Sequence, residues 1–375
     1  MEETAKPVTQ KERLAWLRLY RSDNVGPVTF RRLISKYKTA EKALEALPEI
    51  SLRGGKKRAI RVFEEDRALQ EIESVKKLGG RFCLSCDTDY PSALRAVEDG
   101  PAVLTLLGRG NISQKNPVIG IVGARNASLN GRRFTEKLAK NLSENGVIIV
   151  SGLARGIDTA AHTGSLSTET WAVVAGGVDV VYPRENQKLY DEIKERGLII
   201  SENPLGVHPT ARHFPRRNRI VSGLSQGVAV IEAGVRSGSL ITARMAAEQG
   251  RDVYAVPGFP GDPRSAGPNK LLKDGAILLQ TADDILDQIA HPQIIPKLLF
   301  DGITEQEEFS ENDEIEEKID QEKIISMLSH VPTPIDEIVR ACHVSISGVQ
   351  SVLLDLEIAG RLQRLPGNRV GLVND

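Results

Sequence analysis

Short runs of consecutive apolar residues alternate with segments of helical periodicity through the middle of the chain. Such runs indicate strands that are covered on both faces, because a strand with one face in water alternates apolar and polar residues. Strands that alternate with helices predict a doubly wound α/β domain with a parallel sheet. The predicted strands are residues 102–108, 117–123, 147–152, 171–177, 198–204, 227–234 and 252–258. The predicted helices include residues 130–144, 157–166, 185–197 and 239–250.

The N-terminal part has a different pattern. Helical apolar spacing over residues ~10–78 is interrupted at Asn24-Val25-Gly26-Pro27. A glycine followed by a proline breaks one helix and can start the next. This pattern is similar to a helix-hairpin-helix or SAM-like module, which often contacts a nucleic-acid backbone. A plain helical packing domain explains it equally well.

The C-terminal part predicts three helices and a hairpin. The helical patterns cover residues 320–330, 333–343 and 345–360, and the hairpin pattern covers residues 361–373. Together they predict a winged-helix-like domain, whose third helix would enter a DNA major groove. That helix has no Lys or Arg from Ser345 to Gly360 and carries Asp355 and Glu357. A winged helix that contacts protein, or a degenerate one, is therefore at least as well supported as one that reads DNA.

These patterns divide the 375 residues into four parts. The predicted parts are a helical SAM-like domain (1–82), a Rossmann-like domain (83–292), an acidic linker (293–318) and a winged-helix-like domain (319–375). No apolar run reaches the ~18 residues of a membrane span, and the N-terminus lacks the apolar core of a secretory signal. We therefore expect a cytoplasmic protein that does not enter the membrane.

The three cysteines agree with a reducing compartment. Cys83 and Cys86 form a C-x-x-C pair, and Cys342 stands alone. No second pair completes a tetrahedral zinc site. We expect reduced thiols and no metal.

Positive charge is concentrated in the α/β domain, although the whole chain has a formal net charge of −1. Residues 301–320 hold ten acids and one lysine, and the rest of the chain has 48 basic and 40 acidic residues, a net charge of +8. Residues 100–135 and 203–231 contain no Asp or Glu but several arginines. Two acid-free basic windows in one domain predict a binding surface for an anionic ligand.

Several predicted strands end in small residues, at the sheet edge where ligands of open parallel sheets bind. Glycines there let the backbone approach a ligand, and the N–H groups of the following helices favour anions. Arg125 comes two residues after Gly123, which ends the predicted strand at 117–123, and can bind a phosphate in bidentate fashion. The sequence therefore predicts a shared phosphate-binding crevice. Its small residues include Gly123, Ser151, Gly152, Gly176 and Gly177.

Motifs for common cofactors are missing. The stretch "GIVGARNASLNG" does not fit G-x-G-x-x-G, and no Walker A lysine follows any strand, so we expect no cofactor. Asp158 and His162 lie four residues apart on a predicted helix, and we interpret His162 as a bonded, structural neighbour of Asp158. Glu232 is the best lone candidate for a catalytic carboxylate. Alternatively, it orders the "GVRSGS" loop.

The motifs together resemble the DNA-processing protein A family (DprA, also called Smf). They include "GARNAS", "SGLARGIDTAAH", "FPRRNRIVSGLS" and "IEAGVRSGSLITARMAAEQGRDVYAVPG". The resemblance covers roughly residues 87–290. It implies a protein without established enzymatic activity that binds single-stranded DNA during natural transformation, protects it and helps to load the RecA recombinase. It also implies a homodimer whose interface lies near the end of the α/β domain, with Leu278 and Leu279 as candidates.

The resemblance also implies which residues line the DNA site. Residues 211–225 would enter the helix after the strand at 198–204, with their N-terminal end at the carboxyl edge of the sheet. One phenylalanine among arginines has the composition of a single-strand site, where bases stack on an aromatic ring and phosphates meet cations. The expected contacts are the small residues named above, Arg125, Arg212, Phe214, Arg216, Arg217, Asn218 and Arg219. Arg217 and Arg219 could instead pair with Glu232 or Asp158 and hold the pocket together.

Two other function classes compete with this one. The segment "IEAGVRSGSLITA" also resembles, more distantly, the glycine-rich turn of nucleotide phosphoribohydrolases, which use Arg and Glu in the same kind of pocket. The helix position of their Glu holds apolar or small residues here, which weakens that alternative. The third class is a winged-helix transcription regulator with an α/β sensor domain, which would bind duplex DNA.

Overall fold

The structure, a computed structural model, describes residues 9–53, 59–113, 115–291, 321–329, 332–342, 344–365 and 367–373. The described residues form two compact units. The first contains Met1–Trp16 and Glu65–His291, and the second contains Leu17–Glu64 and Pro292–Asp375, as far as these are described. The predicted linker, residues 293–318, lies outside the described residues. None of the described helices is long and apolar enough to cross a membrane.

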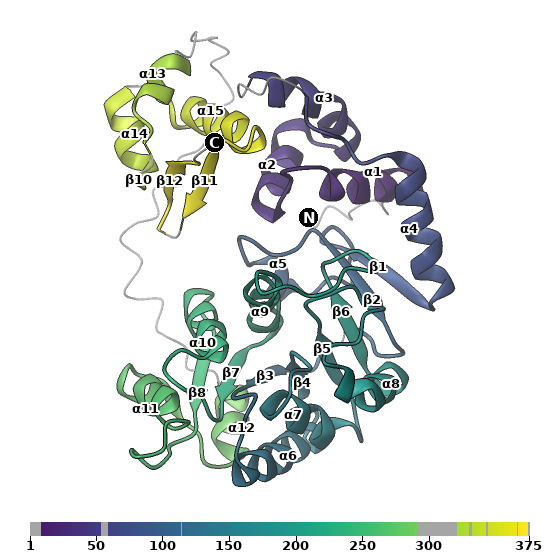
Figure 1. Cartoon of the computed structure of the whole chain (residues 1–375), viewed down its shortest axis with the longest axis vertical. Helices are drawn as coiled ribbons and strands as arrows, with labels where there is room; N and C mark the ends of the chain where they lie inside the picture. Colours follow the sequence, from purple (N-terminus) through teal and green to yellow (C-terminus); the bar gives the residue numbers. More distant parts are fainter. Residues whose placement is uncertain are drawn as a thin grey trace. The chain divides into compact units, whose positions relative to one another are not determined.

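A nine-stranded sheet forms the centre of the first unit, in the order β1-β2-β6-β5-β4-β3-β7-β8-β9 (Figure 1). The strands from β6 to β9 are parallel to one another, whereas β2 is antiparallel to both β1 and β6. Their bounds are β1 (Gly80–Leu84), β2 (Val103–Leu107), β3 (Val118–Val122), β4 (Ile148–Ser151), β5 (Thr170–Val173), β6 (Leu198–Ser201), β7 (Gly227–Val230), β8 (Asp252–Ala255) and β9 (Ile277–Leu278).

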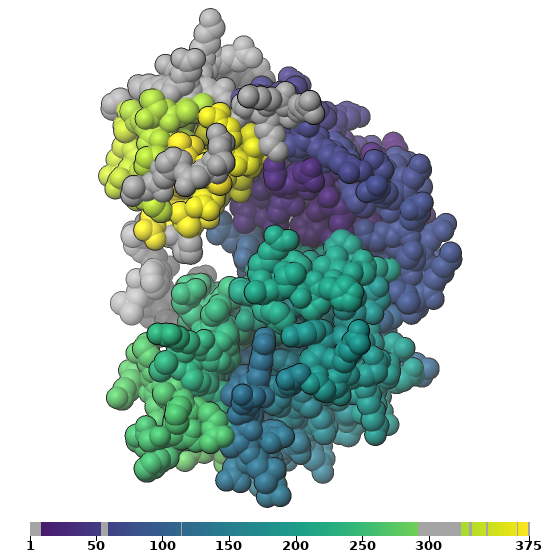
Figure 2. Space-filling view, in the orientation of Figure 1, coloured from purple at the N-terminus to yellow at the C-terminus, as the bar shows by residue number. Residues whose placement is uncertain are grey.

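Helices cover both faces of this sheet, and the two faces have separate apolar cores. Val118 and Val122 of β3 pack in a core with α9 and α10, whereas Ile119 and Ile121 pack in a core with α6, α7 and α12. This split follows from the strand period of two. The helices are α4 (Glu65–Lys77), α5 (Ser92–Arg95), α6 (Leu129–Glu144), α7 (Ile157–Ser165), α8 (Gln187–Arg196), α9 (His213–Leu224), α10 (Gly238–Glu248), α11 (Ala266–Lys273) and α12 (Asp283–Ala290). Figure 2 shows the teal and green segments of this unit packed side by side.

The predicted doubly wound fold class is confirmed, with two differences in detail. The strand predicted at residues 102–108 runs antiparallel to its neighbours as β2, because β1 and β2 form an extension of the parallel sheet rather than a βαβ unit. The expected domain boundary after residue 82 falls inside β1, and α4 and β1 belong to the same unit as the sheet.

The second unit contains the N-terminal helices and the winged-helix part. Helix α1 (Gln10–Arg21) runs from the first unit into the second. Helix α2 (Pro27–Tyr37) begins after Gly26, as the Gly-Pro pair predicts, and α3 (Ala40–Arg53) follows. The winged-helix part has a three-stranded sheet in the order β10-β12-β11. Its elements are α13 (Gln321–Ser326), β10 (Thr333–Pro334), α14 (Ile335–Cys342), α15 (Ile346–Ile358), β11 (Leu362–Leu365) and β12 (Arg369–Leu372).

The close packing of α6 on α7 supports a prediction about stability. A β-carbon on Gly164 would lie 2.3 Å from the backbone oxygen of Glu136, which cannot move away without shifting the helix. We expect Gly164→Ala to lower the free energy of unfolding by about 1–3 kcal/mol. Urea unfolding of the purified chain measures this change.

Gly238→Ala is the matched control, because no atom lies within 4 Å of a β-carbon at this position on α10. We expect the control to be neutral or slightly stabilising. Equal free energies of unfolding in the two variants would contradict the close packing at Gly164.

Candidate functional site

A pocket of about 230 Å³ opens at the carboxyl ends of three neighbouring strands, β3, β4 and β5, beside the first turns of α9. The loops after these strands and the start of α9 supply its walls. This position is the one expected for a ligand of an open parallel sheet. The lining residues are Arg125, Asn126, Gly152, Ala154, Arg155, Val174, Ala175, Gly176, Val180, Tyr182, Pro183, Pro209, Phe214 and Arg217.

Two rings and a guanidinium group meet at the mouth of the pocket. The guanidinium carbon of Arg125 lies 5.0 Å from the centroid of the Phe214 ring, within the range of a cation–π contact. The ring of Tyr182 lies 5.8 Å from that of Phe214 at an interplanar angle of 55°. Tyr182 is 47% exposed, so a planar ligand could reach it from solvent. The mouth therefore offers an aromatic surface next to an exposed cation.

A second guanidinium group, that of Arg217, lies buried at the base of the pocket. Arg217 is only 7% exposed, and its Nε has no hydrogen-bond partner among the described residues. Burial lowers the pKa of Arg217, the Asp158 carboxylate opposes this shift, and nearby Arg125 adds to it. A buried donor without a partner is costly. An anion that entered the pocket would satisfy this donor.

A glycine makes room for this guanidinium. A β-carbon on Gly152 would lie 1.4 Å from Nη1 of Arg217, so the turn after β4 accepts the arginine only because Gly152 has no side chain. Asp158, at the start of α7, holds the same turn by accepting hydrogen bonds from the N–H groups of Gly152 (3.2 Å) and Ala154 (3.3 Å). Burial raises the pKa of Asp158, and Arg217 is the largest influence in the opposite direction.

The structure brings together only part of the expected contact set. Arg125, Gly152, Gly176, Phe214 and Arg217 line the pocket. The exposed Arg212 and Arg216 lie at the start of α9, and Arg216 lines a small neighbouring hollow with Arg217. The other expected residues are used within the fold. The Ser151 hydroxyl donates to the Ile121 carbonyl, Gly123 packs against Ile157, the Gly177 N–H donates to the Val207 carbonyl, and the Asn218 amide donates to the Gly238 carbonyl.

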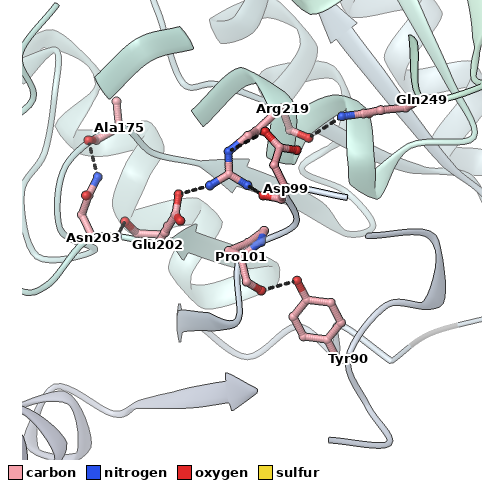
Figure 3. A network of polar contacts seen from close by, with 9 residues as sticks. Tyr90, Asp99, Pro101, Ala175, Glu202, Asn203, Arg219 and Gln249 are labelled. Carbon is pink, nitrogen blue, oxygen red and sulfur yellow. Dashed lines mark hydrogen bonds and ion pairs between the residues drawn. The ribbon is translucent and has the colours of Figure 1, made fainter. Parts of the chain in front are cut away.

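Arg219 has a structural role and does not line the pocket (Figure 3). It pairs with Glu202 and donates a hydrogen bond to the backbone carbonyl of Asp99. The Gln249 side chain in turn donates to the Arg219 carbonyl over 3.3 Å. These contacts fix α9 against the segment after β6 and the loop before β2. The suggested pairing of Arg219 with Glu232 or Asp158 is therefore wrong.

Sequence reasoning missed several lining residues, of which Tyr182 is the most informative. It lies in the loop after β5, within the stretch "VDVVYPREN". An aromatic residue in a loop that follows a parallel strand was the available signal. Arg155 also lines the pocket and forms an ion pair with Glu185.

The candidate catalytic carboxylate is held by the fold. Glu232 accepts hydrogen bonds from both the N–H (2.8 Å) and the hydroxyl (2.6 Å) of Ser128. It thus orders the loop after β3 rather than the "GVRSGS" loop. His162 is also structural, but its Nδ1 is bonded to the hydroxyl of Thr170 (2.8 Å) and not to Asp158 as expected.

Among the residues that the structure describes, one group of side chains has donor atoms close enough to hold a metal ion: Cys83, Asp87 and Asp89. Asp87 already accepts hydrogen bonds from Arg13 (2.9 Å) and from the N–H of Leu84 (2.8 Å). Burial raises the pKa of Cys83, with Asp89 and Asp87 adding to the shift, so its thiol stays protonated. This chemistry does not favour a metal site.

Comparison with known proteins then decides the family. The family model of DNA recombination-mediator protein A matches residues 81–290. The chain belongs to the DNA recombination-mediator protein A family. Its flanks match the DprA-like N-terminal HHH domain over residues 10–74 and the DprA winged helix domain over residues 310–368. The family resemblance seen in the sequence is confirmed.

Relatives of this family resemble the chain over different lengths. Protein Smf of Synechocystis is 33% identical over 96% of this chain and 99% of its own length. DNA processing protein DprA of Bacillus subtilis is 45% identical over 53% of this chain and 68% of its own length. A structure of DNA processing protein A from Streptococcus pneumoniae covers 75% of this chain and 99% of that chain, with a TM-score of 0.62 and 34% identity. A structure of DNA processing protein A from Helicobacter pylori, described by its single-stranded DNA binding mode, covers 56% of this chain and 96% of that chain. Its TM-score is 0.51 and its identity 28%.

The buried His162 next to this site supports a prediction about pH. Burial, assisted by Arg217, lowers the pKa of His162 to about 3. Below pH ~6.5 the unfolded chain binds a proton at this residue that the folded chain does not, so stability falls as the pH drops from 6.5 towards 3. Between pH 7 and pH 5 the protonation of this residue in the unfolded chain should lower the free energy of unfolding by about 2 kcal/mol.

Urea unfolding at the two pH values measures the loss. We expect His162→Gln to lose about 2 kcal/mol less than the original chain between them. His291→Gln, at an exposed residue after α12, is the control and should follow the original chain. The same loss in all three proteins would refute the assignment.

Proposed function

We propose that this chain binds single-stranded DNA in the pocket at the carboxyl ends of β3, β4 and β5. A backbone phosphate would bind the guanidinium groups of Arg217 and Arg125, and a base would stack on Phe214 and Tyr182. The observation that carries the proposal is the buried Nε of Arg217, which has no hydrogen-bond partner in the described part of the chain, below a partly exposed aromatic surface.

The geometry favours a single strand over a duplex. Stacking on Phe214 needs a base whose face is free, and the bases of a duplex are already stacked and paired. Aromatic stacking accepts every base, and phosphate contacts carry no sequence information, so the binding would be tolerant of sequence. The affinity would depend strongly on salt, because each phosphate contact releases counterions.

Family membership supports the wider role. The relative from Helicobacter pylori is described as binding single-stranded DNA, and relatives from several bacteria are named DNA processing proteins. We accordingly propose that this chain acts in the cytoplasm during natural transformation, where it protects incoming DNA and helps to load RecA onto it. The proposed role is binding and not catalysis, and the engagement of Glu232 with Ser128 supports this.

A homodimer is part of the proposal, and the exposure of the two candidate leucines bears on its surface. Leu279 is fully buried in the core of its own chain, so of the two leucines only Leu278, 47% exposed, can reach a partner. An open hollow of about 820 Å³, between α10, α11 and β9, is lined by apolar residues that include Leu240 and Ile277. Sedimentation of the Leu278→Glu variant tests this surface. A dimer that persists unchanged would exclude it.

Substitution of the two residues at the mouth tests the pocket. We expect Phe214→Ala to lose about 1–3 kcal/mol of binding energy for a single-stranded oligonucleotide, because a stacked base loses its platform. Arg125→Ala should weaken binding and reduce the salt slope by about one counterion. Fluorescence anisotropy over a range of salt concentrations, with single- and double-stranded probes, measures both effects.

Arg133→Ala on α6 and Phe259→Ala after β8 are the matched controls, because both side chains are exposed and neither lines the pocket. Unchanged affinity in both mouth variants would exclude this pocket as the DNA site. Preference for a duplex probe would favour the regulator alternative.

Gly152→Ala tests the base of the pocket. The added methyl group would occupy the place of the Arg217 guanidinium, so we expect the arginine to be displaced and the affinity for a single strand to fall at least tenfold. Gly238→Ala serves again as the control, because its surroundings are open. A folded Gly152→Ala protein with unchanged affinity would mean that Arg217 does not contact the DNA.

A further inference from the structure

The third helix of the winged-helix part, α15, is buried on two opposite faces. Val349, Val352, Leu353 and Leu356 pack in the apolar core of the winged-helix part itself. A second face, formed by Ser351, Leu354, Asp355 and Ile358, follows the i, i+3, i+4, i+7 spacing of a helix. Leu354, Asp355 and Ile358 are also buried, yet they lie outside that core. Another part of the same unit must therefore cover this face.

Helices α2 and α3 cover it. The Lys36 ammonium donates a hydrogen bond to the Ser351 hydroxyl (2.8 Å), and the Arg32 guanidinium lies 3.4 Å from the carboxylate of Glu357. At the end of α15, the Asn24 side-chain amide donates to the Ile358 carbonyl (2.9 Å). Asn24 lies in the turn between α1 and α2, so the turn is covered together with the helices.

Acids of α15 face cations of the N-terminal helices, although α3 also carries Glu49 near Tyr37. Helix α15 contributes Asp355 and Glu357, and the N-terminal helices contribute Arg32, Lys36 and Arg53, whose charges act on these carboxylates. Burial raises the pKa of both acids, and the basic residues only oppose the shift. One oxygen of Asp355 is buried without a hydrogen-bond partner among the described residues. The contact therefore carries a desolvation cost, which limits its net stability.

Because desolvation limits the net stability of this contact, a competing anion can replace the carboxylates of α15 on the N-terminal helices. The Glu357 carboxylate on Arg32 and the Ser351 hydroxyl on Lys36 occupy places that phosphate oxygens would take, with charge-assisted hydrogen bonds of the same kind. A polyanion would satisfy these cations and return Asp355 to water, while Glu357 would keep its ion pair with Arg364 of β11 (3.3 Å). A duplex or single strand fits this requirement better than an apolar partner, because Arg32, Lys36 and Arg53 take part in the contact.

We propose that the basic face of α2 and α3, with the turn at Asn24, is a second binding site for a nucleic-acid backbone, which α15 covers in the closed form of the chain. In this arrangement the winged-helix part does not read DNA with its third helix. It competes with nucleic acid for the N-terminal helices, and bound DNA shifts the chain to the open form.

Two arginine substitutions on α15, one helical turn apart, test the proposal in the full chain. Ser351→Arg places a cation against Lys36 and opens the contact, and the substitution lies outside the winged-helix core. Ser347→Arg adds the same charge at an exposed position of the same helix and is the matched control. Both are made in a chain that also carries Arg125→Ala and Phe214→Ala, so that the pocket contributes little to binding. Because only these two variants are compared, the test holds whether or not the pocket binds DNA.

The first measurement is fluorescence anisotropy with oligothymidylate of roughly 30 nucleotides and with a duplex of similar length. We expect Ser351→Arg to bind at least about tenfold more tightly than Ser347→Arg, because the basic face is uncovered. Further substitution of Arg32→Ala and Lys36→Ala should remove this gain. Equal affinities, or a gain that survives the loss of Arg32 and Lys36, would overturn the proposal.

The second measurement is hydrogen exchange of residues 24–36, which reports opening directly. We expect faster exchange in Ser351→Arg than in Ser347→Arg, and also in the original chain when oligonucleotide is added. Unchanged exchange in Ser351→Arg would show that the named contacts do not hold α15, which also overturns the proposal. If Ser351→Arg unfolds the winged-helix part, Glu357→Gln replaces it, with Glu337→Gln at an exposed position of α14 as its control.

Discussion

The guanidinium of Arg217 is enclosed beneath the turn that follows β4, and the pocket is arranged around it. Three features hold it there: the missing side chain of Gly152, the Asp158 carboxylate that braces the turn, and the fixed position of α9. A buried cation whose Nε has no hydrogen-bond partner among the described residues stabilises the fold poorly by itself. The fold alone thus places a cation at the base of the pocket.

Arg219 sets the position of α9 from the opposite side. Its ion pair with Glu202 and its bond to the Asp99 carbonyl tie the helix to the segment after β6 and to the loop before β2. Two arginines only two residues apart therefore have different tasks, because successive helical positions face different directions. Arg217 lines the pocket, and Arg219 holds the helix that carries Phe214 to its mouth.

The second unit also contains arginine and lysine side chains at a contact surface, but there they meet groups of the protein itself. In the second unit, Arg32 is paired with Glu357 of the same chain. In the first unit, by contrast, Arg217 lines an open pocket. The acids of α15, Asp355 and Glu357, interact with cations of the N-terminal helices in this contact. A winged helix can keep its fold while its third helix binds protein, because a different face of that helix packs in the winged-helix core.

The sequence by itself determined the doubly wound sheet, the helical and winged-helix flanks, and the presence of Arg125, Phe214 and Arg217 near one sheet edge. Buried strands, glycine-rich strand ends and acid-free windows are local patterns, and strand periodicity converts them into a topology. Only the tertiary structure decided which neighbouring side chain each residue meets. It placed Arg217 in the pocket and Arg219 on Glu202, and it brought Tyr182 beside Phe214. It also bonded Glu232 to Ser128 and His162 to Thr170, and buried Leu279 in the core. These partners come from segments far apart in the chain, and no local pattern records which of them will be packed together.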